Sequence, residues 1–83
     1  VSSEKRALVL RIVDKACMKL GGIRGSTYQL ALEFAFYALE AIRQEDEAWL
    51  DEIIQTYNEM GVPIDVLNNI VKRLKKLGGA VVE

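Results

Sequence analysis

The residue types that perform chemistry in proteins are scarce in this sequence. It has no histidine, the commonest general base and a common metal ligand, and it has one cysteine, Cys17. Cys17 lies among apolar residues with no histidine to activate its thiol, so we expect a buried structural side chain rather than a nucleophile or an attachment point. Glu33 and Glu40 are separated by about 10 Å of helical rise, too far for a coupled carboxylate pair. We therefore predict no enzyme activity, no metal site, no cofactor and no small-molecule substrate.

Basic residues form two groups, one toward each end of the chain. Arg11, Lys15 and Lys19 recur at steps of four residues, as they would along one face of a helix. The two groups together make a candidate interaction ridge: Arg11, Lys15, Lys19, Arg24, Lys72, Arg73, Lys75 and Lys76. The simpler interpretation is a solvated surface whose long side chains cover apolar neighbours. The alternative is a contact surface for an anionic partner; the sequence pI of about 5.5 argues against nucleic acid as that partner.

A strip of polar side chains interrupts the otherwise apolar stretch of residues 26–44. Its members follow one another at intervals of four, four, three and four residues, so they share one helix face: Gln29, Glu33, Tyr37, Glu40 and Gln44. This strip is called the polar seam below. Because an unpaired buried carboxylate is costly, the seam must face water or cations. We favour partial pairing of Glu33 and Glu40 with the basic residues of the first helix, within one chain or across a subunit boundary.

The composition favours a small domain that meets another chain. The sequence has 83 residues, of which 51% are hydrophobic. That length suits one domain, residues 1–83, with a modest core, and no set of disulfides adds to its stability. Some apolar surface should therefore contact a partner, and the side chains that widen the apolar stripes are Leu8, Leu10, Met18, Leu32 and Phe36. We see no membrane span and no signal-peptide pattern, and we expect a soluble, cytoplasmic protein.

Charge is distributed unevenly along the chain. Residues 1–24 carry a net charge of +4, residues 25–65 carry −8 and residues 66–83 carry +3, for a total of −1. The ends of the chain are therefore basic and its middle is acidic. Such a distribution allows attraction between neighbouring helices, attraction between subunits, or binding of an anionic partner.

Apolar residues that recur at three and four residues predict four helices, at residues 3–20, 26–43, 46–60 and 63–77. Ser26 and Gln29 have the spacing of a capping box at the start of the second helix, and Gly21, Gly61 and Gly78 suit helix ends. The short connections force consecutive helices to lie side by side. The predicted fold is all-α, a compact antiparallel four-helix bundle with short loops, in which the nearly uncharged second helix is the most buried.

The C-terminal half contains a segment that resembles a known family. The segment Tyr57-Asn58-Glu59-Met60-Gly61-Val62-Pro63-Ile64-Asp65 is similar to the last two helices of the phycobiliproteins, and Tyr37-Ala38-Leu39 looks like the stretch that precedes those helices. In that family the bilin-bearing cysteine is followed by Arg and Asp, whereas Cys17 is followed by Met18 and Lys19. The resemblance therefore implies kinship with light-harvesting assemblies rather than a bound chromophore.

Three functions remain open at this stage. We expect a non-enzymatic, self-associating helical module, such as a structural, scaffold or protein-interaction subunit. The alternatives are a phycobiliprotein-like helical fragment and a small protein that binds nucleic acid or another anionic partner through its basic ridge.

Overall fold

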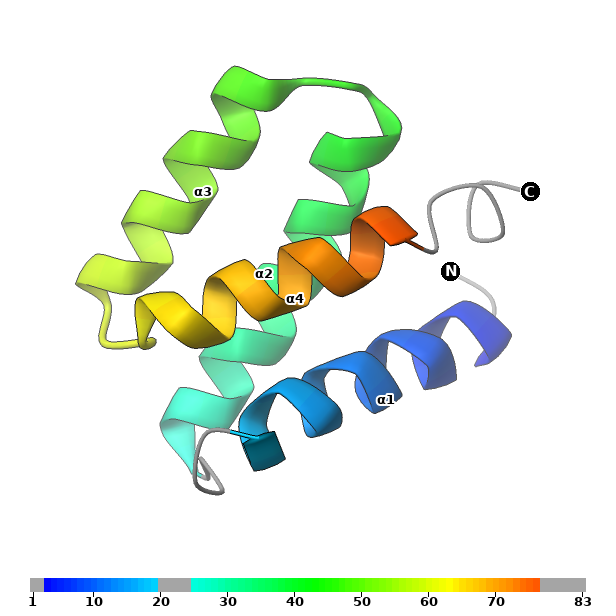
Figure 1. The fold of residues 1–83 in the computed structure, drawn as a ribbon, viewed down its shortest axis with the longest axis vertical. Helices are drawn as coiled ribbons and strands as arrows, with labels where there is room; N and C mark the ends of the chain where they lie inside the picture. The colour runs from blue at the N-terminus through cyan, green and yellow to red at the C-terminus, as the bar shows by residue number, and fades with distance from the viewer. Residues whose placement is uncertain (1–2, 20–24, 77–83) are drawn as a thin grey trace.

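A computed structural model describes residues 3–19 and 25–76, which form four helices (Figure 1). They are α1 (Ser3–Lys19), α2 (Ser26–Arg43), α3 (Glu47–Glu59) and α4 (Ile64–Lys76). Each bound lies within one residue of its predicted position, and the predicted all-α four-helix fold is confirmed. Consecutive helices pack against each other, as the short connections require. Figure 1 also shows α1 beside α4, running in the opposite direction, and α4 crossing in front of α2.

Two helices, α2 and α4, share the centre of the molecule. Each packs against the other three helices, whereas α1 and α3 lie on opposite sides of this central pair (Figure 1). As predicted for the second helix, α2 buries more residues than any other helix among the described residues, six of its 18, while α4 buries five of its 13. The two helices contribute differently to the core. Four of the six buried residues of α2 are alanines, whereas the buried residues of α4 are all branched: Val66, Leu67, Ile70, Val71 and Leu74.

Phe34 is the largest side chain that α2 buries. It is fully buried, and its ring meets that of Tyr57 on α3 edge to face, with 5.7 Å between the ring centroids and 61° between the planes. This geometry suits the quadrupoles of two aromatic rings. Phe34 therefore ties α2 to α3, while the alanines beside it keep the rest of the α2 surface flat enough for close packing.

The start of α2 differs from the predicted capping box. Ser26 is the first helical residue rather than the cap; the cap is Gly25, no side chain caps this end, and the amide of Gln29 donates to the carbonyl of Gly25 at 3.2 Å. Gly25 has a φ of 72°, a conformation that glycine adopts at little cost. The chain therefore turns into α2 at the glycine, one residue before the position that the hydroxyl would have needed.

The connections that follow α2 and α3 end these two helices with the same pattern of backbone hydrogen bonds. After α3, the amide of Gly61 donates to Asn58 and that of Val62 donates to Tyr57, both at 3.1 Å. After α2, Glu45 and Asp46 donate to Ile42 and Ala41 in the same pattern, at 3.0 Å. Both are Schellman motifs, which need a residue with positive φ after the cap: Gly61, as predicted, and Glu45, where no glycine marks the turn. The predicted glycine ends at Gly21 and Gly78 lie outside the described residues.

Most of the side chains that widen the apolar stripes are used inside the molecule. Leu8, Leu32 and Phe36 are half-buried and pack against the core. Met18 remains 76% exposed, and Tyr37 is 53% exposed. Leu8, Leu32 and Phe36 therefore bury part of their apolar surface within the chain, and contact of the remaining surface with another chain stays a prediction.

A hydrogen bond between side chains joins α1 to α2. The hydroxyl of Tyr28 donates to Oδ1 of Asp14 at 2.6 Å. This bond to a carboxylate, followed by partial burial, raises the pKa of Tyr28 to about 12. The neutral phenol is thus the form that the folded chain stabilises.

We predict that Phe34→Ala lowers the free energy of unfolding by about 3–5 kcal/mol, because it removes a fully buried ring and leaves a cavity beside Tyr57. Chemical denaturation followed by circular dichroism measures the change. As a control, Met18→Ala at an exposed site should alter stability by less than about 0.5 kcal/mol. Equal losses in the two variants would contradict the placement of Phe34 in the core.

We also predict that the Tyr28 bond contributes stability that is complete below pH 10, the unfolded pKa, and is lost as the pH rises toward 12. Ultraviolet titration of the tyrosines should show one ionisation near pH 12 that disappears in Tyr28→Phe and moves to lower pH in Asp14→Asn. A step near pH 12 that persists unchanged in Tyr28→Phe would assign it to another tyrosine and refute the prediction.

Candidate functional site

The antiparallel pairing of α1 and α4 brings the two basic groups of the sequence together. Between these helices lies a groove of about 280 Å³, called the basic groove below and lined by Leu8, Arg11, Ile12, Lys15, Arg73 and Lys76. Leu8 is half-buried and Ile12 is 5% exposed, so the groove has an apolar floor beneath four cationic side chains. Among residues 3–19 and 25–76, no acidic side chain lines the groove.

Neighbouring residues extend the basic groove along α4. Asn69 and Lys72 line an adjoining hollow with Arg73 and Lys76. Nε of Arg73 donates to Oδ1 of Asn69 at 2.6 Å, which holds the guanidinium in place at the groove. Lys75 is directed elsewhere, since its Nζ lies 3.7 Å from Oε1 of Glu47 on α3. Of the predicted ridge, Arg24 and the side chain of Lys19 lie outside the described residues.

The polar seam faces water along one side of α2. All five of its residues are exposed: Gln29, Glu33, Tyr37, Glu40 and Gln44. Oε1 of Glu33 accepts a long hydrogen bond of 3.4 Å from the hydroxyl of Tyr57. Glu40 lies 3.8 Å from the guanidinium of Arg43 and accepts a bond of 3.0 Å from Gln44.

The favoured pairing of the seam with α1 is therefore absent within the described chain. Arg11 and Lys15 make no ion pair there with Glu33 or Glu40, because they line the groove toward α4, whereas the partner of Glu33 comes from α3. The seam adjoins α3 instead. Burial of Tyr57, together with the charge of Glu33, raises the pKa of the Tyr57 phenol, so it remains a hydrogen-bond donor at neutral pH.

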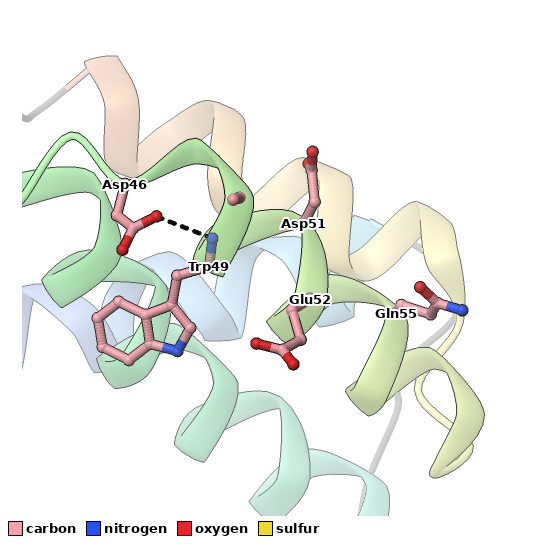
Figure 2. A pocket seen from close by; sticks show the side chains of 6 residues that line it. Asp46, Trp49, Asp51, Glu52 and Gln55 are labelled. Carbon is pink, nitrogen blue, oxygen red and sulfur yellow. Dashed lines mark hydrogen bonds between the residues drawn. The ribbon is translucent and has the colours of Figure 1, made fainter.

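A second charged surface covers the outside of α3, and the sequence interpretation did not single it out. Figure 2 shows this open hollow, which is lined by Asp46, Ala48, Trp49, Asp51, Glu52 and Gln55. Oδ1 of Asp46 caps α3 by accepting from the amide of Trp49 at 3.0 Å (Figure 2). Tyr37 of the seam lines a neighbouring hollow with Trp49 and Glu52. The acidic face, defined as Tyr37, Asp46, Trp49, Asp51 and Glu52, therefore combines carboxylates with two aromatic rings.

The chemical inventory of the described residues is otherwise sparse. Cys17 is 2% exposed, which confirms the predicted burial, and this burial together with the charge of Asp14 raises the pKa of its thiol. Within residues 3–19 and 25–76, no group of three or more Cys, Asp or Glu side chains is arranged to hold a metal ion. None of the helices in that part of the chain is long and apolar enough to cross a membrane.

Comparison with family models, curated proteins and solved structures finds no match to this chain. The resemblance to phycobiliproteins stays a prediction. Its segment corresponds to the end of α3, the turn at Gly61 and the start of α4. A colourless native preparation would rule out a bound bilin chromophore.

The sequence predicted most residues of the basic groove but not how they are arranged in space. The four-residue spacing marks Arg11 and Lys15 as neighbours, and the charge at the end of α4 marks Arg73 and Lys76. That the two groups share one groove follows from the packing of α1 on α4, which no local pattern encodes. The signal that could have indicated the acidic face is the run of carboxylates from Glu45 to Glu47 followed by Trp49.

We predict that Glu33→Gln and Glu40→Gln each change the free energy of unfolding by less than about 0.5 kcal/mol, since both carboxylates are exposed and their contacts are long or local. Thermal and chemical denaturation at neutral pH measure the change. A loss of about 2–4 kcal/mol in either variant would instead reveal a seam desolvated by a contact with another chain.

Proposed function

We propose that this protein is a non-enzymatic helical module whose function is to associate with other copies of itself, as a structural or scaffold subunit. One observation carries the proposal: opposite charges gather on separate surfaces. The basic groove lies between α1 and α4, and the acidic face lies on α3 and the adjoining edge of α2. Among the described residues, no ion pair joins the groove to the acidic face; the ion pair between α4 and α3, Lys75–Glu47, uses residues of neither surface.

Charge complementarity supports association in two ways. Opposed surfaces attract each other and accelerate encounter, and they disfavour partners that carry the wrong sign. Exposed apolar side chains beside the charges add area that contact with another chain would cover, namely Met18 on α1 and Tyr37 on α2. The absence of histidine from the sequence and the buried thiol of Cys17 are consistent with a role without catalysis.

A second candidate function is the binding of an anionic partner such as nucleic acid. The observation that favours it is the convergence of four cations in a groove that no acidic side chain lines among the described residues. Against it stand the net charge of −1 and the acidic half of the surface, which repels a polyanion. Self-association uses both halves of the charge distribution, and we therefore place it first.

The proposed function predicts a mass above that of the 9.3 kDa monomer at micromolar concentration and low salt. Raising the salt to about 1 M shortens the screening length to about 3 Å, so the mean mass should fall toward that of the monomer. Sedimentation velocity over a range of protein and salt concentrations measures both effects. A mass of 9.3 kDa under every condition would refute self-association.

A further inference from the structure

We propose that the basic groove of one copy receives the acidic face of a second copy, so that successive copies join head to tail. The inference rests on the proposed function and specifies its interface. It makes the contact heterologous, with a different surface used on each partner. Such contacts close into rings or extend into filaments, depending on the rotation between neighbouring copies.

The basic groove suits the side chains of an amphipathic helix. Its volume of about 280 Å³ accommodates side chains rather than a whole helix, whose diameter is about 10–12 Å. The helix would therefore lie across the groove and insert side chains between α1 and α4. Arg11 and Lys15 are one helical turn apart, and Arg73 and Lys76 stand on the facing helix, so carboxylates of the inserted helix would meet cations from two sides.

The acidic face has the matching composition. Asp51 and Glu52 are exposed and form no ion pair within the described part of the chain. Figure 2 shows the indole of Trp49 between the carboxylates of Asp46 and Glu52. Trp49 is half-buried and Tyr37 is 53% exposed, so both rings offer apolar area to the floor formed by Leu8 and Ile12. Aromatic anchors surrounded by polar groups are typical of protein interfaces.

The charge distribution favours a second copy over nucleic acid as the occupant. Residues 25–65 carry a net charge of −8, and this charge repels a phosphate backbone that approaches the groove. A second copy turns the same charge into attraction, because the acidic face is the part that docks. The two surfaces use different residues, and no ion pair joins them within the described chain, so each copy offers both to its neighbours.

Charge reversal at exposed positions tests the interface. Lys15→Glu/Lys76→Glu cancels the positive charge of the groove, because Arg11 and Arg73 remain, and Asp51→Lys/Glu52→Lys makes the acidic face positive. All four side chains are exposed, so each variant should keep the helical circular dichroism spectrum of the wild type. Each variant alone should associate roughly a hundredfold more weakly than the wild type, since its altered surface no longer attracts the intact surface of the next copy. Sedimentation velocity at low salt measures the association.

The mixture of the two variants gives the decisive result. An equimolar mixture retains an unaltered junction, between the acidic face of the groove variant and the groove of the face variant, and at the other junction the introduced glutamates meet the introduced lysines. The mixture should therefore associate much more strongly than either variant alone. A mixture that remains monomeric would overturn the inference, as would a variant that associates alone as strongly as the wild type.

A matched control separates the groove from overall charge. Arg6→Glu/Lys75→Glu makes the same change in net charge on the same two helices, at exposed side chains that do not line the groove. It should retain the mass distribution of the wild type. If the wild type associates and this control loses association as fully as the groove variant, net charge governs assembly and the specific interface is refuted, while self-association survives.

A final arm tests the other occupant. A fluorescent single-stranded DNA oligonucleotide is titrated with the wild type and the groove variant at low salt, and fluorescence anisotropy measures binding. We expect no binding that depends on Lys15 and Lys76. If the wild type is monomeric at every concentration yet binds the oligonucleotide, and the groove variant does not, both the inference and self-association fail, and the groove is a nucleic-acid site.

Discussion

The close packing of α2 against α4 is the constraint on which the rest of the structure depends. The buried alanines of α2, such as Ala35 and Ala38, present little side-chain volume, and the branched residues of α4 supply the volume that a dense core requires. With these two helices crossed at the centre, α1 and α3 are left on opposite sides (Figure 1). This division decides which surface residues become neighbours.

The electrostatic character of the molecule follows from that division. The helices that carry most of the basic residues, α1 and α4, lie side by side, and their cations converge on one groove. Most of the acidic residues lie on α2, on α3 and in the turn between them. The net charge is only −1 because the charges of two surfaces of opposite sign nearly cancel. The proposed self-association would use both surfaces, and salt would weaken the attraction between them.

The connections set the direction of each helix and thereby the position of these surfaces. After α2, Glu45 adopts a φ of 56°, a left-handed conformation that costs a residue with a side chain about 1–2 kcal/mol. That turn delivers Asp46 to the cap of α3, where its carboxylate holds the amide of Trp49. The strained turn at Glu45 therefore lies directly before the α3 residues of the acidic face.

Local patterns in the sequence determined the helices, their bounds and the buried side of each, because periodicity, helix capping and turn formation act within a few residues along the chain. Trp49 and Tyr57 on one stripe, or the turn at Gly61, illustrate how much such patterns contain. They did not determine that Glu45 would take a left-handed turn, that α4 would share the centre with α2, or that Arg11 would stand opposite Arg73. Those outcomes depend on contacts between residues far apart in the chain, and only the packing of complete helices, with their differing side-chain volumes, decides which of the helix faces meet.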